Sequence, residues 1–330
     1  MAQTRFDVLG IGNAIVDVIT SASDAFLEER DLHKGSMRII DADEAEALYQ
    51  EMGAGIEASG GSAGNSIAGI GSLGGRGAFI GKVKNDQLGE IFAHDIRAIG
   101  VHFESAAATS GPPTARCLIL VTDDAQRTMN TYLGACVTLT EADVDEALVR
   151  NAQITYLEGY LWDPPPAKAA FRRAMEIAHA AQRRVALTLS DAFCVDRYRA
   201  EFRDLVSGQV DILFANEDEI MSLYETDSFD EALQQVRATG TLAALTRSEK
   251  GQVIVQGEEI HVLNCEPVDK VIDTTGAGDQ FAAGFLFGLS QGRDLATCGR
   301  LGGIAAAEII SHYGARPEAS LAELVRQKGL

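Results

Sequence analysis

Short apolar runs rich in β-branched residues alternate along this 330-residue chain with longer segments of helical periodicity. Strands covered on both faces read as near-continuous apolar runs, and crossover helices supply that cover. The alternation therefore predicts an α/β fold, a doubly wound and mostly parallel sheet flanked by helices. The predicted strands are Phe6–Ile11, Ala78–Ile80, Thr155–Leu157, Val185–Leu189, Ile212–Phe214, Ala243–Leu245 and Val253–Val255. The predicted helices include Ala167–Gln182, Phe229–Thr239, Gln280–Leu289 and Asp294–Ser311.

Two stretches break the alternation and hold strand-like pieces of their own. In the second stretch, the runs CLILV and RTMNTYL flank the polar turn Thr122–Gln126, which predicts a β-hairpin. We expect residues of about 14–40 and 102–133 to form a small β-sheet lid on a single α/β domain spanning 1–330. Lids of this kind exclude water from a reacting centre.

The charge balance limits the class of partner. The formal net charge is −20, from 28 Lys+Arg and 48 Asp+Glu. That field disfavours nucleic acid and membrane surfaces, so a small molecule is the expected partner. The five cysteines lie far apart without zinc-ligand spacing, and no signal peptide or bilayer-length apolar run is evident. We therefore predict a cytoplasmic protein, and the sequence leaves open a monomer or a homodimer.

The segment Asp273–Asp279, DTTGAGD, is the most informative in the chain because an apolar helical pattern follows it. Free N–H groups and the dipole at a helix N-terminus can bind a phosphate without any lysine or arginine. Asp279 falls in the first turn, where its carboxylate could accept a proton from a substrate hydroxyl. We expect the helix dipole to lower the pKa of Asp279. An aspartate-rich helix cap after a glycine turn is the competing interpretation.

The longer stretch Asp273–Phe285, DTTGAGDQFAAGF, resembles the C-terminal signature of the ribokinase-like (PfkB-type) family of sugar and nucleoside kinases. That resemblance implies that Asp279 is the catalytic base and that the amides of Gly276, Ala277 and Gly278 form the anion hole. It also implies ATP and Mg²⁺ as cofactors. The chain has no GxxxxGK[ST] loop, so a P-loop kinase is disfavoured.

Two N-terminal segments resemble substrate-binding motifs of the same family. In the segment GGSAGN, the resemblance implies a role in ribose or sugar binding for Gly60, Gly61, Ser62 and Asn65. In the segment GIGNAIVD, it implies that Asn13 and Asp17 contact the sugar hydroxyls. The GxG of that second segment lacks the third glycine of a dinucleotide-binding motif, which weakens an NAD-dependent dehydrogenase as an alternative.

Further family-like positions concern the phosphates, the nucleotide and bound ions. Asn216 and Glu219 resemble the NxxE motif that holds Mg²⁺ through water, although a helix start is the alternative interpretation. Asp273 and Thr275 match a monovalent-cation site, which raises the hypothesis of K⁺ dependence. The resemblance implies an ATP-binding role for Thr246, Gly251, Thr275 and His312. Arg127 matches an arginine that acts on the transferring phosphate, and an exposed hairpin arginine is the alternative.

The predicted acceptor is adenosine, because the first motif and the lid segments resemble the adenosine kinases of this family. They would place apolar walls around a purine at Ile15, Met37, Ile39, Cys117 and Met129. Tyr160 and Trp162 would offer an aromatic face to the base, and packing of Trp162 in the core is the alternative interpretation. The predicted reaction is transfer of the γ-phosphate of ATP to the 5′-hydroxyl of adenosine, giving AMP. A sugar kinase of the same family, of fructokinase or ribokinase type, and a non-catalytic nucleoside-binding protein are the alternatives.

Overall fold

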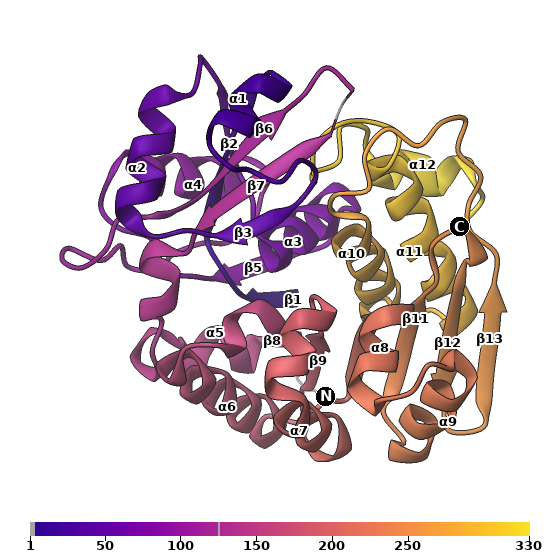
Figure 1. Ribbon diagram of the computed structural model, residues 1–330. Coiled ribbons are helices and arrows are strands. Elements are labelled where there is room, and N and C mark those ends of the chain that lie inside the picture. Colours follow the sequence, from indigo (N-terminus) through magenta and orange to yellow (C-terminus); the bar gives the residue numbers. More distant parts are fainter. Residues whose placement is uncertain (1–3, 125) are drawn as a thin grey trace.

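The computed structural model describes residues 4–124 and 126–330, and an eight-stranded sheet forms its centre (Figure 1). The strand order is β13-β12-β11-β10-β9-β8-β1-β5. The strands from β11 to β5 in this order are parallel, and β12 and β13 add an antiparallel edge. The bounds are β1 (Phe6–Ile11), β5 (Gly77–Ile80), β8 (Ala152–Glu158), β9 (Arg184–Thr188), β10 (Ile212–Asn216), β11 (Leu242–Thr246), β12 (Gln252–Gln256) and β13 (Glu259–Leu263).

The mostly parallel α/β sheet predicted from the sequence is confirmed, and each of the seven predicted strands exists. The prediction did not include β13. Ile260 and Val262 of that strand are exposed at the sheet edge, so it carries no buried apolar run by which a sequence could indicate it.

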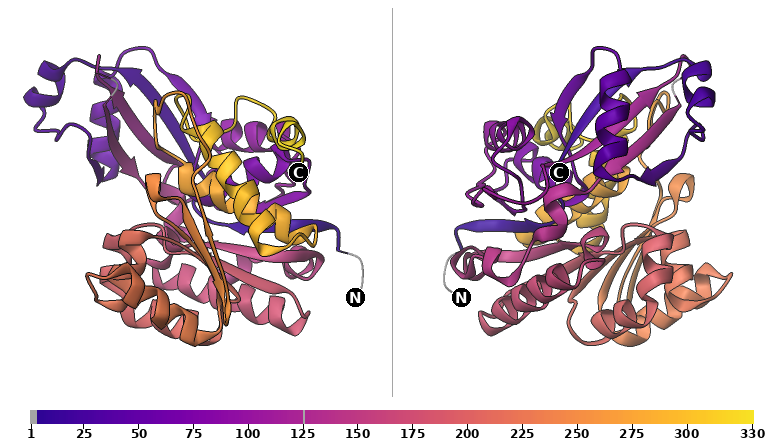
Figure 2. Two further views of the ribbon diagram at one scale, coloured as in Figure 1. Left: turned by 90° about the vertical axis from the view of Figure 1, so that its right-hand side faces the viewer. Right: turned by 60° about the vertical axis from the view of Figure 1, so that its left-hand side comes forward.

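Helices cover both faces of the sheet, which explains why the strands are apolar on both sides (Figure 2). One face is covered by α5 (Glu146–Asn151), α6 (Pro165–Ala180), α7 (Ala192–Gly208), α8 (Glu217–Tyr224) and α9 (Phe229–Thr239). The other is covered by α3 (Ser62–Ser72), α4 (Gln87–Ala98), α10 (Ala277–Ser290) and α11 (Leu295–Ile309), and α12 (Leu321–Gln327) packs outside them. Short 3-10 helices span Gly134–Thr138, Glu141–Asp143, Gly159–Trp162 and Ser248–Lys250.

A second, five-stranded sheet projects from the carboxyl edge of the large sheet, in the order β3-β7-β6-β2-β4 (Figures 1 and 2). Its strands are β2 (Ile15–Ser21), β3 (Met37–Ile39), β4 (Ile56–Ser59), β6 (Ala115–Val121) and β7 (Arg127–Tyr132). The predicted hairpin is present as the antiparallel pair β6–β7, although Ala125 in its turn lies outside the described residues. The helices α1 (Asp24–Glu29) and α2 (Ala42–Glu51) pack on one face of this lid sheet.

The lid differs from its predicted extent in two places. It includes β4, which follows α2 and pairs with β2 outside the predicted segments. Residues 102–114, by contrast, run along the core, where His102 bridges to Ala78 of β5 and Ala108 bridges to Lys84. The strand β4 is short, and Ile56 is exposed at the sheet edge, so its sequence pattern is weak.

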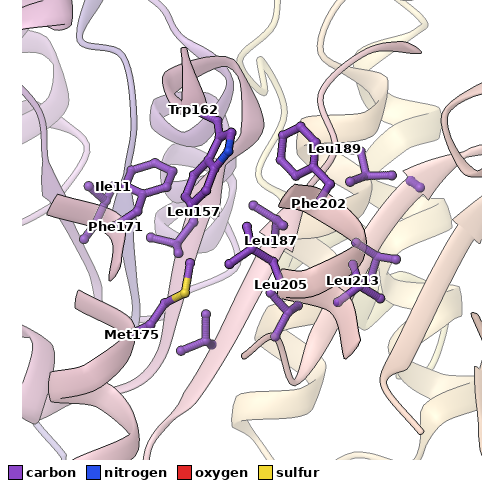
Figure 3. Packing of buried hydrophobic residues seen from close by; sticks show 14 of the residues in the cluster. Ile11, Leu157, Trp162, Phe171, Met175, Leu187, Leu189, Phe202, Leu205 and Leu213 are labelled. Carbon is purple, nitrogen blue, oxygen red and sulfur yellow. The ribbon is translucent and has the colours of Figure 1, made fainter. Parts of the chain in front are cut away.

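Trp162 lies in the core on the α5–α9 face of the large sheet (Figure 3). Its ring is fully buried and packs against Phe171 and Phe202, with ring centroids 6.1 and 6.0 Å apart. Its Nε1 donates to the carboxylate of Glu201 at 3.1 Å. The prediction that Trp162 offers an aromatic face to a base is therefore wrong, because neighbouring side chains already cover the ring.

We expect the variant Trp162→Ala to lower the free energy of unfolding by about 3–5 kcal/mol, because it removes a large, fully buried side chain from a packed core. Urea denaturation followed by far-UV circular dichroism measures this loss. The control is Phe193→Ala, since Phe193 is 66% exposed and its removal should change the stability by less than about 1 kcal/mol. Equal effects of the two variants would contradict the assignment of Trp162 to the core.

Candidate active site

The start of α10 carries backbone N–H donors that have no partner within the helix. Gly276 caps the helix with a φ of +78°, and a Cβ there would lie 2.7 Å from the Cβ of Ala315, so only glycine fits. In the described part of the chain, the N–H groups of Gly278 and Asp279 form no backbone hydrogen bond. A Cβ on Gly278 would meet no atom within 4 Å, so the space beside these donors is open. Of the amides predicted to form the anion hole, that of Ala277 already donates to the Thr274 carbonyl at 3.2 Å, so the free donors here are the N–H groups of Gly278 and Asp279, which can bind an anion.

Asp279 is held by two side chains from the start of α3. Its Oδ1 accepts from the Ser62 hydroxyl at 2.6 Å, and its Oδ2 accepts from Asn65 Nδ2 at 3.0 Å. Burial raises the pKa of Asp279, although the hydrogen bonds from Ser62 and Asn65 lower it. The expected lowering of this pKa is therefore wrong, because desolvation outweighs the stabilising contacts. A higher pKa makes the carboxylate a better proton acceptor.

The paired glycines bring the lid strand β2 against the start of α3. Gly61 has a φ of +87°, and a side chain there would collide with the carbonyl oxygen of Asn13. A Cβ on Gly60 would lie 2.5 Å from Asp17 Oδ2, so the Asp17 carboxylate rests against the glycine pair. Burial raises the pKa of Asp17 to about 6, and Arg316 and Arg127 oppose this rise. Ser62 and Asn65 thus contact Asp279 directly, and Asn13, Asp17, Gly60 and Gly61 pack together beside the start of α3.

Glu158, the last residue of β8, organises this group and was not predicted as a site residue. Its carboxylate accepts from Asn13 Nδ2 at 2.5 Å and from the Ala63 N–H at 2.8 Å. It also fills the space beside Gly12 that any side chain there would need. The sequence signal was a carboxylate that directly ends an apolar strand. The Oδ1 atom of Asn13 is buried and has no partner among the described residues, so it is available to a ligand.

The predicted apolar walls lie on one face of the lid sheet, the face that also carries Asp17. The register pairs Asp17 with Cys117, Cys117 with Thr131, and Thr131 with Ile39. The adjacent row pairs Met129 with Met37, which is 45% exposed, as Ile39 is 54% exposed. Ile15 lies two residues before Asp17 and so shares its face. Apolar side chains therefore flank a carboxylate on the uncovered side of the lid.

Asn216 and Glu219 form a capping box at the start of α8, as the alternative interpretation of the NxxE motif expected. The Glu219 carboxylate accepts from the Asn216 N–H at 3.0 Å and from Asn216 Nδ2 at 2.6 Å. Burial raises its pKa to about 7, and Asp191, Asp218 and Asp279 add to the rise. Because both carboxylate oxygens already accept hydrogen bonds, the pair suits a contact to Mg²⁺ through water better than direct ligation.

Asp273 and Thr275 do not fit the predicted K⁺ site. The Asp273 carboxylate accepts from the Thr275 hydroxyl at 2.8 Å and from the Gly314 N–H at 3.1 Å. Arg127 Nη1 forms an ion pair with the same carboxylate at 2.8 Å, and both side chains are buried. A cation at this carboxylate would have to compete with the Arg127 guanidinium and with the N–H groups of Thr275 and Gly314, which already occupy it. Arg127 is thus neither an exposed hairpin residue nor directed at an open space. Its ion pair joins the lid to the segment Asp273–Asp279, the anion loop.

The remaining predicted residues lie around the rim of the site or serve the local fold. Thr246 pairs with Asn216 at the carboxyl ends of β11 and β10. Gly251 has a φ of +84°, and its turn excludes a side chain because Leu263 and Asn264 lie beside it. The Tyr160 hydroxyl donates to the Ser190 carbonyl at 3.1 Å. His312 is half-buried, and its Nε2 atom forms a hydrogen bond with Glu308 Oε1 at 3.1 Å. The ring that was predicted to lie near adenine is therefore already bound to a carboxylate of the protein.

The chain was also compared with models of known protein families. The model described as pfkB family carbohydrate kinase matches residues 37–321. The chain belongs to this family. Its members are phosphotransferases with an alcohol acceptor, and this kinase uses ATP and a small-molecule substrate.

Relatives within the pfkB family differ in the activity that their names state. An adenosine kinase from Sinorhizobium meliloti is 56% identical, with 98% of this chain and 99% of that chain covered and a TM-score of 0.92. A probable sugar kinase from Rhizobium etli is 54% identical, with 99% of both chains covered and a TM-score of 0.93. Adenosine kinase 1 of Arabidopsis thaliana is 28% identical over 95% of this chain and 97% of its own length. The likeness establishes the ribokinase-like fold.

In residues 4–124 and 126–330, no group of three or more His, Cys, Asp or Glu side chains is arranged to hold a metal ion. Across the same residues, every helix is too short or too polar to cross a bilayer.

The buried Glu158 carboxyl predicts a pH dependence of stability. Burial raises the pKa of this carboxyl from 4.5 to about 7. Its contribution to the free energy of unfolding is therefore fully present below about pH 4.5 and is lost as the pH rises through 7. The variant Glu158→Gln stays neutral, so its free energy of unfolding should fall less than that of the wild type between pH 5 and 8, by about 2 kcal/mol. Urea midpoints at several pH values measure the difference.

The control for this experiment is Glu29→Gln, because the Glu29 side chain is exposed at the surface of the lid. Its pH profile should follow the wild type. An identical pH profile for wild type and Glu158→Gln would contradict the burial and the raised pKa assigned to the Glu158 carboxyl.

Proposed function

We propose that this pfkB kinase phosphorylates the 5′-hydroxyl of adenosine with the γ-phosphate of ATP, giving AMP. The observation that carries the proposal is the apolar lid face formed by Met37, Ile39, Cys117 and Met129 beside Asp17. A purine base is bound well by apolar walls, whereas a bare sugar needs hydrogen-bonding groups on every side. One face that combines apolar walls with a single carboxylate suits a nucleoside.

The ribose would lie between the lid and the start of α3. Asp17 accepts hydrogen bonds from ribose hydroxyls, and the unpartnered Oδ1 of Asn13 accepts another. Gly60 and Gly61 leave no side chain between the ribose and the backbone. This arrangement would direct the 5′-hydroxyl toward Asp279, because Ser62 and Asn65, next to the glycine pair, bind the Asp279 carboxylate.

Asp279 acts as the base in the proposed reaction. Its carboxylate takes the proton from the 5′-hydroxyl while that oxygen bonds to the γ-phosphorus, and the bond from this phosphorus to the bridging oxygen of ADP breaks. The N–H groups at the start of α10 stabilise the negative charge on the transferring group. The buried setting keeps water away from the reacting phosphorus.

Mg²⁺ would neutralise phosphate charge during the transfer, as it does in phosphoryl-transfer enzymes generally. Asn216 and Glu219 would hold its water ligands from the start of α8, consistent with the capping box described above. The Arg127 guanidinium lies close enough to the anion loop to contact a bound phosphate, provided that its ion pair with Asp273 opens.

The names of the two most similar structures reported above support different acceptors. The Sinorhizobium meliloti adenosine kinase favours adenosine, and the Rhizobium etli probable sugar kinase makes a sugar the second candidate. Parallel assays with adenosine, ribose, fructose and a panel of other hexoses separate the two. We expect adenosine to give a kcat/KM at least about 100-fold above any sugar. Turnover of a sugar without turnover of adenosine would overturn the proposal.

We expect Asp279→Asn to lower kcat by about 10² or more while the affinity for adenosine changes by less than about tenfold. The amide cannot take the proton, but it keeps the size of the carboxyl. Steady-state kinetics gives kcat, and calorimetry gives the affinity. The matched control is Asp294→Asn at the start of α11, where asparagine preserves the helix cap and kcat should not change. Near-normal turnover by Asp279→Asn would contradict the assigned role.

A further inference from the structure

Arg316 lies at the rim of the acceptor site, in the turn that follows α11. A guanidinium Nη2 atom lies 3.7 Å from the position that a Cβ on Gly64 would take, so the side chain rests on the first turn of α3. The preceding residue, Ala315, packs against Gly276 and accepts from Gln280 Nε2 at 3.1 Å. The turn is therefore fixed to the start of α10, and it places Arg316 beside α3.

Arg316 contacts the residue that holds the proposed base. Its Nε donates to Asn65 Oδ1 at 3.4 Å, while Asn65 Nδ2 donates to Asp279 Oδ2 at 3.0 Å. An amide has one accepting and one donating end, so a donor on its oxygen keeps the NH₂ group turned toward Asp279. Arg316 thus favours the rotamer of Asn65 that the site needs.

The Arg316 guanidinium also has a hydrogen-bond donor that the described residues leave unpaired. Its Nη2 atom is buried and has no hydrogen-bond partner among the described residues. Burial lowers the pKa of Arg316 to about 10, and the charges of Asp17 on β2 and Asp95 on α4 oppose this change. The Asp95 carboxylate already accepts from the Ser59 N–H at 3.1 Å. The Asp17 carboxylate forms no hydrogen bond with the described residues, so it is free to accept from a bound alcohol. Burying a guanidinium costs desolvation free energy, and its attraction to a nearby carboxylate offsets part of that cost.

We infer that Arg316 is a positioning residue for the acceptor alcohol, which keeps Asn65 oriented toward Asp279 and supports Asp17 as the acceptor of hydrogen bonds from the alcohol's hydroxyls. The inference concerns the same site as the proposed adenosine kinase activity, and its functional arm rests on that proposal. The charge of Asp17 is the quantity that Arg316 controls. Protonation would turn one accepting oxygen of Asp17 into a donor, so it would bind the hydroxyls less well.

The groups that face Asp17 come from four elements. Arg316 approaches from the turn after α11 and Arg127 from β7, and both favour the carboxylate form. Asp279 on α10 opposes it, and burial opposes it most strongly. The neighbouring Cys117 on β6 is a neutral thiol, because burial raises its pKa to about 12. Removing Arg316 therefore raises the pH at which Asp17 becomes charged, since burial and Asp279 are then opposed by Arg127 alone.

The direct test is a ¹³C NMR titration of the aspartate carboxyl carbons in the full chain, with the Asp17 signal assigned from Asp17→Asn. We expect a midpoint near pH 6 in the wild type, a midpoint about one unit or more higher in Arg316→Met, and a midpoint near the wild-type value in Arg316→Lys. The control is Arg300→Met, an exposed arginine on α11, which should not move the midpoint. An unchanged midpoint in Arg316→Met would overturn the inference.

The kinetic test uses the same variants. At pH 6, Arg316→Met should raise KM for the acceptor about fivefold, with a deficit that shrinks toward pH 9, while KM for ATP stays within about twofold. A loss of activity independent of pH would indicate a purely structural role and overturn the inference. If Arg316→Met does not fold, Arg316→Gln replaces it. If neither folds, an Asp17 midpoint above about pH 8 in the wild type overturns the inference.

The two proposals fail separately in these experiments. The NMR titration requires no acceptor, so a shifted Asp17 midpoint supports the role of Arg316 whether or not adenosine is phosphorylated. Turnover of adenosine with an unmoved midpoint would leave the proposed function intact and remove the inference about Arg316.

Discussion

The site depends on the buried contact between Asp279 and the first turn of α3. Ser62 and Asn65 bind the two oxygens of this carboxylate from more than two hundred residues away. The contact requires that α3 and α10 approach closely, and Gly69 permits it, since a Cβ there would lie 2.6 Å from the Cβ of Ala283. Two helix N-termini thus meet at one carboxylate, which places the acceptor motif and the anion loop in one cleft.

Desolvation dominates the electrostatics of this cleft. It raises the pKa of Asp17, Glu158, Glu219 and Asp279, and the only buried or nearby cations that oppose it at Asp17 are Arg316 and Arg127, within the described residues. In the proposed function, this acidic protein would bind a triphosphate here through backbone N–H groups at the start of α10, not through side-chain charges. The net charge of −20 is therefore no obstacle to anion binding at this point.

Much of the fold could be predicted because the strands from β11 to β5 are buried on both faces and read as apolar runs. The exposed edge strands β4 and β13 lack that pattern and were not predicted. For the site, motifs of glycine, asparagine and aspartate were informative because close backbone approach restricts which residues fit. Trp162 was misassigned, since an aromatic residue after a strand can face a cleft or a core, and only packing decides.

The sequence by itself determined the parallel α/β architecture, the helix-start anion loop with Asp279 in its first turn, and the glycine pair that must lie against backbone. These features follow from local periodicity and from steric limits at single residues. Tertiary structure alone decided the pKa of Asp279, the pairing of Arg127 with Asp273, and the places of Glu158 and Arg316. Those depend on desolvation and on contacts between segments far apart in the chain, which no local pattern encodes.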